Sequence, residues 1–404
     1  MPCYVHFGAG NIGRALAGAV FSRAGYRVVF VDAVPEIVNA LQTRGAYRVV
    51  VKDTLPAGAP DSFTVSNVDG IDVRDTEAVK AAVARADLIG TAVGAVHLPG
   101  VLAAIASGLP LRNGRPVSLL FCENLHGLAA MAREALTAGL PPGFPLAKQV
   151  GLVETSIGKM VPLMPAEVRR RDPLEVWGEA YNAIIADRNG FVGEVPEGIE
   201  GLLLKDCFQA YVGRKLYIHN LGHAACACHG FLRGHTLICD AIADDAVLAE
   251  TRTVMTESAR ALIRRYPSEF NAANQTEHVE DLLRRFGNRA LGDTVFRVGR
   301  DLPRKLAPGD RFIGGLRLAQ AEGGDIAPVC RAIAAALRFA ATDEAGQPSP
   351  ADAAFREQIA REGAEAVLCA QCGLDPVRDA AALGMIAAAL EEGKAKAQRR
   401  KGDA

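Results

Sequence analysis

The chain has 404 residues, enough for about two domains with separate cores. Its 45 basic and 46 acidic side chains nearly cancel, so charge gives no reason to expect nucleic acid or a membrane surface as a partner. No apolar run reaches the ~18 residues that span a bilayer. The first residues lack the basic and apolar regions of a signal peptide, so we expect a cytoplasmic protein.

The nine cysteines are scattered, as expected for reduced thiols rather than for a disulfide framework. Two groupings could bind metal: Cys226, Cys228 and His229 in one, Cys369 and Cys372 in the other. Structural zinc usually takes two pairs at matched spacing, whereas these lie about 140 residues apart. We expect no metal.

A short apolar strand at residues 4–7 leads directly into the turn G-A-G-N-I-G. An alanine-rich helix at 14–23 and a second strand at 27–31 follow, and that strand ends in Asp32. This order is typical of a dinucleotide-binding unit, in which the phosphates sit at the helix N-terminus.

Each residue of this turn has a physical task in that unit. Gly8 permits the tight turn, Gly10 lets the backbone approach the pyrophosphate, and Gly13 lets helix and strand pack. Asp32 can accept hydrogen bonds from the ribose hydroxyls and would repel a 2′-phosphate, which favours NAD over NADP. The predicted cofactor-binding residues are Gly8, Gly10, Asn11, Ile12, Gly13, Asp32 and Gly94.

Further buried strands are predicted at 87–93, ending at Gly94, and at 117–122 and 149–155. After a loop rich in glycine and proline the strands stop and helices follow, including one at 203–230. The fold class is therefore α/β, with a Rossmann-type domain at 1–190 and a mostly helical domain at 191–404.

Asn124 directly follows the strand at 117–122. Polar residues at the carboxyl end of a parallel strand open into the binding crevice, so Asn124 is a candidate amide for an oxyanion pocket. A helix or turn cap is an equally good interpretation.

The segment 215–223 reads K-L-Y-I-H-N-L-G-H. On a helix, ~100° per residue sets Lys215, His219 and His223 within about 80° of one another and Asn220 near 140°. A lysine whose pKa falls in an apolar pocket can act as a general base, an amide can stabilise an alkoxide, and an imidazole can hold a hydroxyl. The segment favours metal-free oxidation of an alcohol, and a surface lysine above helix-capping residues is the alternative.

Four basic residues lie within nine positions in the segment R-V-G-R-D-L-P-R-K, which glycine and proline predict to be a loop. Arg297, Arg300 and Lys305 could bind a phosphorylated or polyhydroxylated substrate. The alternative is a solvated loop.

Residues 6–14, H-F-G-A-G-N-I-G-R, are similar to the opening of mannitol-1-phosphate 5-dehydrogenases, in the polyol-specific long-chain (mannitol) dehydrogenase family. Further segments resembling that family follow in order along almost the whole chain. They are T-A-V-G at 91–94, C-E-N at 122–124, D-P-L-E-V at 172–176, R-K-L-Y-I-H-N-L-G-H at 214–223 and R-V-G-R-D-L-P-R-K-L at 297–306.

The resemblance implies a Rossmann domain, a helical C-terminal domain and an active site between them that oxidises a polyol with NAD(P) and no metal. The family pattern K-x-x-x-x-N-x-x-H falls on Lys215 as base, Asn220 and His223, with Asn124 as the second amide. The family's substrate-binding arginine and lysine match Arg297 and Lys305.

The chain departs from the family at two places. Ile157-Gly158-Lys159 stands where V-D-R is usual, and Gly213 replaces an acid two residues before the lysine. Both changes fall near the expected substrate, so they bear on which polyol is used.

We therefore expect an NAD-dependent dehydrogenase, a monomer or homodimer, that interconverts the small molecules mannitol 1-phosphate and fructose 6-phosphate. Action on an unphosphorylated sugar alcohol or a uronate-type keto-sugar acid stays open. A zinc alcohol dehydrogenase using His219, His223 and the nearby cysteines, and an NAD-sensing module without catalysis, are the remaining alternatives.

Overall fold

The computed structural model describes residues 1–402 except 57, 124, 126 and 163, without the side chains of 394 and 396–402. The chain forms two compact units, Met1–Phe208 and Gln209–Ala404. The boundary predicted from the sequence falls after residue 190. The first unit continues past that point because residues 184–187 pair with residues 202–205.

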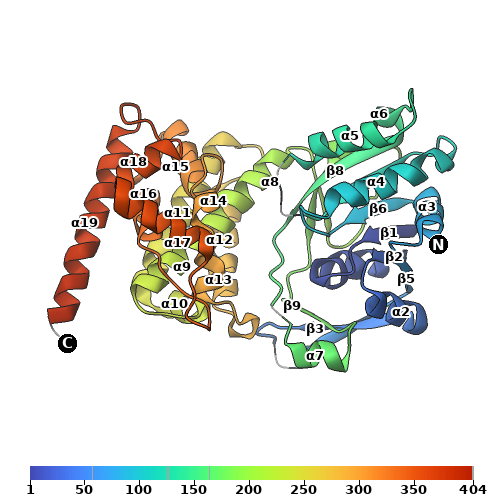
Figure 1. Ribbon diagram of the computed structural model, residues 1–404, viewed down its shortest axis with the longest axis horizontal. Helices are drawn as coiled ribbons and strands as arrows, with labels where there is room; N and C mark the ends of the chain where they lie inside the picture. Colours follow the sequence, from blue (N-terminus) through green and yellow to red (C-terminus); the bar gives the residue numbers. More distant parts are fainter. Residues whose placement is uncertain (57, 124, 126, 163, 403–404) are drawn as a thin grey trace. The chain divides into compact units, whose positions relative to one another are not determined.

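The first unit holds every named strand of the described chain (Figure 1). They are β1 (Cys3–Phe7), β2 (Arg27–Asp32), β3 (Ala46–Val51), β4 (Ser62–Ser66), β5 (Val68–Asp72), β6 (Leu88–Thr91), β7 (Val117–Phe121), β8 (Val150–Ile157), β9 (Val176–Gly178), β10 (Ile184–Asp187) and β11 (Leu202–Lys205).

Eight strands form one sheet in the order β11-β10-β8-β7-β6-β1-β2-β5, and three form another in the order β4-β3-β9. From β5 to β8 all neighbours are parallel, whereas β10 runs antiparallel to β8. Numbered along the chain, the six parallel strands have the Rossmann order 3-2-1-4-5-6. The order reverses between β1 and β6, where such sheets bind dinucleotides.

Helices cover both faces of the large sheet because its strands are apolar on both sides. In β1, Tyr4 belongs to one core, packed under the first helix, whereas Val5 and Phe7 belong to the other, packed under α3 and α4. The helical segments of this unit are the π-helix η1 (Gly13–Gly18), α1 (Ala19–Arg23), α2 (Pro35–Arg44), α3 (Thr76–Arg85), α4 (Leu98–Gly108), α5 (Leu128–Gly139), α6 (Leu146–Gln149), α7 (Ala166–Arg171) and the 3₁₀ turns η2 (Leu109–Arg112) and η3 (Arg188–Gly190).

The second unit is helical. Its segments are α8 (Phe208–Arg214), the π-helix η4 (Lys215–Asn220), α9 (Leu221–Leu232), α10 (Ile238–Ala243), α11 (Asp245–Arg265), α12 (Ala272–Phe286), the 3₁₀ turn η5 (Arg289–Leu291), α13 (Val295–Gly299), α14 (Leu302–Lys305), α15 (Arg311–Ala321), α16 (Ala327–Leu337), α17 (Pro350–Glu362), α18 (Ala364–Ala370) and α19 (Ala380–Gly402). Among the described residues, no helix combines the length and hydrophobicity that crossing a bilayer requires.

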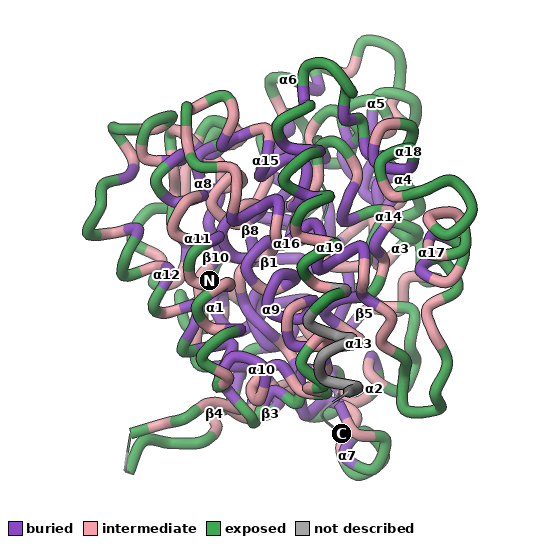
Figure 2. The backbone as a smooth tube through the Cα atoms, turned by 90° about the vertical axis from the view of Figure 1, so that its left-hand side faces the viewer, coloured by how far each residue is buried: buried purple, intermediate pink, exposed green. Residues whose placement is uncertain are grey.

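Helix α9 is the centre of this unit and is buried along most of its length (Figure 2). Small residues let its neighbours approach closely. A Cβ on Gly222 would lie 2.5 Å from Met255, and one on Gly230 would lie 2.6 Å from the Cβ of Ala241. Any larger side chain at either position would push α10 or α11 away from α9.

The predicted fold class, a Rossmann-type domain followed by a mostly helical one, is confirmed. Two local predictions were wrong. The predicted helix at 203–230 starts as strand β11, because pairing with β10 overrides helix propensity there. The predicted loop at 297–305 contains the short helices α13 and α14.

Candidate active site

The glycine turn joins β1 to the first helix at the edge where the strand order reverses. The backbone N–H of Gly8 donates to the Val31 carbonyl at 2.8 Å, and its φ of +98° suits only glycine. A Cβ on Gly8 would lie 2.5 Å from the Ala92 carbonyl oxygen, so the turn needs glycine to pass between β2 and β6.

Gly10 and Gly13 differ in what surrounds them. A Cβ on Gly13 would overlap the Gly8 carbonyl, so helix and turn meet there. In the described part of the chain, no atom beyond the adjacent residues lies within 4 Å of a Cβ built on Gly10, so no contact there requires glycine. An open glycine before a helix that starts at Asn11 and Ile12 fits the close approach of a pyrophosphate.

Asp32, at the end of β2, forms hydrogen bonds with the backbone of the glycine turn and of the residues that follow β2. Its Oδ2 accepts the N–H of Ala9 at 2.6 Å, and its Oδ1 accepts the N–H of Val34 at 2.9 Å. The carboxylate therefore fixes the turn against β2. Each oxygen keeps a further lone pair that can accept a ribose hydroxyl.

Gly94, with φ of +80°, follows β6 in the loop beside the switch point. The buried carboxylate of Glu123 accepts the N–H of Val93 at 2.8 Å and that of Gly94 at 2.9 Å. This role of Glu123 was not predicted, although an acid at the end of β7, next to β6, was a signal in the sequence. Asn124 lies outside the described residues.

Lys215 opens the π-helix η4, which Asn220 closes, within one continuous helical stretch from α8 to α9. The i→i+5 bonds widen this turn, so the angles expected for a regular α-helix do not apply across it. Such single turns are frequent at functional sites. Burial lowers the pKa of Lys215 to about 8, and the nearby positive charge of Arg311 adds to the effect.

His223 lies in the first turn of α9, and its ring stacks on that of Phe286. The ring centroids are 4.6 Å apart and the ring planes differ by 8°. The Nε2 of His223 lies 3.6 Å from Oδ2 of the buried Asp293 and forms no hydrogen bond within the described chain. Burial, then the charge of Arg297, lowers the pKa of His223 to about 3, so the ring is neutral near pH 7. His219 is buried beside it, with 6.2 Å between ring centroids.

The predicted basic residues lie on the same unit, with Arg297 on α13, Lys305 on α14 and Arg300 between the two helices. Arg297 pairs with Asp293, Arg300 lies over the Phe296 ring at 5.6 Å, and Lys305 donates to the Arg300 carbonyl. Lys305 is only 4% exposed, so the interpretation as a solvated loop fails for it. Burial, then the charges of Arg311 and Arg304, lowers the pKa of Lys305 to about 8.

The site contains more positive charge than the sequence indicated. Arg285 is 2% exposed. Arg311 is nearly buried, and its Nε lies 2.9 Å from Oδ1 of Asp310. The positive charges of both arginines lower the pKa of His223. No sequence pattern indicated Arg285, Arg311 or Asp293, whose carboxylate pairs with Arg297 and lies 3.6 Å from His223 Nε2. These residues come from other segments of the chain, so spacing along the sequence gave no signal.

The two departures from the family pattern have structural explanations. Lys159 is buried and donates to the carbonyls of Glu179 at 2.7 Å and Tyr181 at 2.8 Å. It thereby ties the end of β8 to the segment between β9 and β10. Gly213 lies against α11, where a Cβ would stand 3.2 Å from Leu262 Cδ2.

No group of three or more His, Cys, Asp or Glu side chains in the described chain could hold a metal ion. All nine cysteines are free thiols. Burial raises the pKa of Cys226 and Cys228 to about 12, which disfavours the thiolate form that binds zinc.

The parallel sheet in Rossmann order, the glycine turn and the acid at the end of β2 define a dinucleotide-binding protein of the Rossmann class. Residues 3–199 match the family described as Mannitol dehydrogenase Rossmann domain, and residues 208–391 match the Mannitol dehydrogenase C-terminal domain. The chain belongs to the mannitol dehydrogenase family of oxidoreductases, which confirms the resemblance found in its sequence.

Two solved structures are similar in fold. One is Pseudomonas fluorescens mannitol 2-dehydrogenase in a ternary complex with NAD and D-mannitol, with a TM-score of 0.73 and 15% identity over 96% of this chain and 91% of that chain. The other is D-sorbitol dehydrogenase in a substrate-free form, with a TM-score of 0.77 and 17% identity over 95% of this chain and 91% of that chain.

Proposed function

We propose that the protein is a metal-independent, NAD-dependent polyol dehydrogenase with Lys215 as its general base, interconverting mannitol 1-phosphate and fructose 6-phosphate. The observation that carries the proposal is the Lys215 amine, whose pKa burial lowers to about 8 on the π turn shared with Asn220. An amine of this pKa is a competent base near neutral pH, unlike a surface lysine.

The cofactor is NAD. Gly8, Gly10 and Gly13, with the backbone of Asn11 and Ile12, would hold its pyrophosphate at the open face of the turn. Asp32 would bind the ribose hydroxyls, and the Gly94 loop, held by Glu123, would border the nicotinamide. When bound, NAD accepts a hydride from the alcohol carbon.

The residues of the helical unit would handle the proton and the developing charge. Lys215 Nζ takes the hydroxyl proton, and the side-chain amide of Asn220 donates to the alkoxide. Asn124 is the second proposed amide. His223 stays neutral and, with its ring fixed by Phe286, orients a neighbouring hydroxyl.

The buried positive charge supports an anionic substrate. Arg297, Arg300 and Lys305 are the proposed ligands of the phosphate, with Arg285 and Arg311 adding to the potential. Burying like charges near one another costs free energy, which a bound anion offsets.

One observation favours a second candidate, the oxidation of an unphosphorylated polyol or reduction of a uronate-type keto-sugar acid. Arg297 already pairs with Asp293, and Lys305 already donates to the Arg300 carbonyl. A substrate with one negative charge or none would disturb these bonds less than a phosphate dianion.

The test is NADH oxidation by the purified protein with fructose 6-phosphate, fructose and a uronate-type keto-sugar, each at equal concentration. Turnover mainly with fructose 6-phosphate supports the first candidate, and turnover mainly with an unphosphorylated compound supports the second. If no ketose is reduced while NADH still binds, the dehydrogenase proposal is wrong.

A further inference from the structure

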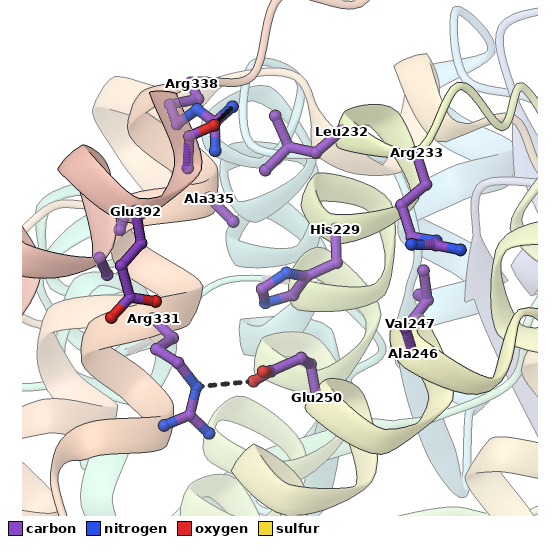
Figure 3. Close-up of a pocket in the computed structure, with 13 residues that line it drawn as sticks. His229, Leu232, Arg233, Ala246, Val247, Glu250, Arg331, Ala335, Arg338 and Glu392 are labelled. Carbon is purple, nitrogen blue, oxygen red and sulfur yellow. Dashed lines mark hydrogen bonds and ion pairs between the residues drawn. The ribbon is translucent and has the colours of Figure 1, made fainter. Parts of the chain in front are cut away.

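A pocket of about 410 Å³ lies within the helical unit, between α9, α11, α16 and α19 (Figure 3). Leu232, Val247 and several alanines form its apolar surface. The polar lining residues are His229, Arg233, Glu250, Arg331, Arg338 and Glu392. This volume is in the range of small-molecule sites, and a few polar groups on an apolar lining are typical of them.

The pocket is separate from the proposed catalytic residues. His229 follows His223 by six residues on α9, which sets it about 9 Å further along the helix and about 120° around it. His229 points into the pocket between Arg338 and Glu250 (Figure 3). The ring of His223 instead stacks on Phe286. None of the residues that line the pocket belongs to the proposed reaction.

Arg338 is held at the pocket by the C-terminal helix. Its Nη2 donates to the Gly393 carbonyl of α19 at 3.1 Å, and a Cβ on Gly393 would overlap the guanidinium. Glycine at 393 therefore makes room for the arginine. Within the described chain no carboxylate lies at ion-pair distance from Arg338, so most of its five N–H donors remain for a ligand.

The other two arginines are already neutralised. Arg331 pairs with Glu250 at 2.8 Å across the pocket, and Arg233 pairs with Asp244 outside it. Glu250 and Glu392 would repel a second negative charge on a ligand. The charge pattern thus suits one negative charge, placed at Arg338.

We propose that this pocket binds a small monocarboxylate with an apolar body. Its carboxylate would accept two hydrogen bonds from the Arg338 guanidinium, a geometry that this planar group favours. Its body would lie against Leu232, Val247 and Ala389. Burial lowers the pKa of His229 to about 4, so near pH 7 its ring is neutral and adds no charge to the pocket.

The probe is benzoate, with neutral benzamide as its isosteric control, in calorimetric titrations of the full-length protein saturated with NADH. Benzoate should bind saturably, and benzamide should bind at least about tenfold more weakly, since it lacks the charge that strengthens hydrogen bonds to arginine. Equal affinities for the two compounds, or no saturable benzoate binding, would overturn the proposal.

Variants assign the binding to this pocket. Arg338→Met and Ala389→Leu should each weaken benzoate binding by at least about tenfold, the first by removing the ionic donor and the second by filling the pocket. Two control variants should leave benzoate affinity unchanged. Ala388→Leu alters an exposed position on the same helix, and Lys305→Met alters the proposed substrate site. Unchanged binding in folded Ala389→Leu, or loss in Lys305→Met, contradicts the assignment.

Discussion

Lys215→Met tests the proposed base, since methionine keeps an apolar stem of similar length and lacks the amine. General base catalysis contributes about 10²–10⁴-fold, so kcat/KM for polyol oxidation should fall by that factor, or about 3–5 kcal/mol of transition-state stabilisation. NADH affinity should stay within about twofold, because the proposed cofactor-binding residues all belong to the other unit.

The pKa of Lys215, about 8, fixes the expected pH dependence. The base must be neutral to take a proton, so oxidation should speed up as pH rises through the folded pKa. Roughly a tenth of Lys215 is neutral at pH 7 and roughly nine tenths at pH 9, which predicts a rise of about ninefold and then a plateau. A lysine with an ordinary pKa of about 10.4 would give a rise of about a hundredfold and no plateau.

The assay is the initial rate of polyol oxidation from pH 6 to pH 10, with NADH affinity measured by fluorescence titration. Circular dichroism shows whether each variant is folded. Lys148→Met, an exposed lysine of the first unit, is the matched control and should match the wild type. The reasoning is refuted if folded Lys215→Met keeps a tenth or more of the activity, or if the wild-type rate climbs through pH 10 without a plateau.

Three further predictions concern other residues. Gly10→Ala should fold normally but bind NADH about tenfold more weakly in fluorescence titrations, whereas Gly13→Ala should lower the melting temperature because its Cβ would overlap the turn. Arg297→Met should raise KM for the phosphorylated ketose by tenfold or more and leave that for fructose almost unchanged, as initial rates would show. Lys159→Met should cost about 1–3 kcal/mol in urea unfolding without changing KM, because it removes a donor to one buried and one partly buried carbonyl.

The N-terminal half of the first unit was predictable because its signals are local. The turn from Gly8 to Gly13 and the acid Asp32 lie within one strand-helix-strand unit, so each residue's task follows from its neighbours. Helix α3 likewise has a local start signal, since Asp75 caps it by accepting the N–H of Ala78.

Segments stabilised by distant residues were not predictable. Helix α14 starts where the buried carboxylate of Asp352, from α17, accepts the N–H groups of Asp301 and Leu302. That cap lies about 50 residues away, so the glycine and proline nearby were the only local signal and predicted a loop. Strand β11 was mistaken for helix because its pairing with β10 is likewise absent from the local pattern.

In the candidate site, too, features that depend on local spacing were predictable and features that depend on distant residues were not. Lys215, Asn220 and His223 were found from their spacing on one helical stretch. The pKa values of Lys215 and His223 depend on burial and on the charge of Arg311, which lies on α15 and approaches them only in the folded unit. Spacing therefore predicted the candidate residues, whereas their pKa values required the structure.

Two lysines of the helical unit have a pKa of about 8, so an inflection near pH 8 in the rate of oxidation could come from either of them. Burial and the charge of Arg311 lower the pKa of both Lys215 and Lys305. The two assignments predict different outcomes for Lys305→Met. If Lys215 is the base, the variant keeps the rise in oxidation rate through pH 8, with a higher KM for the phosphorylated substrate. Loss of the Lys305 charge would instead weaken binding of the phosphorylated substrate, so an inflection from Lys305 is a fall in rate as pH rises through 8, and that fall disappears in the variant. His223 cannot produce the inflection near pH 8, because burial lowers its pKa to about 3.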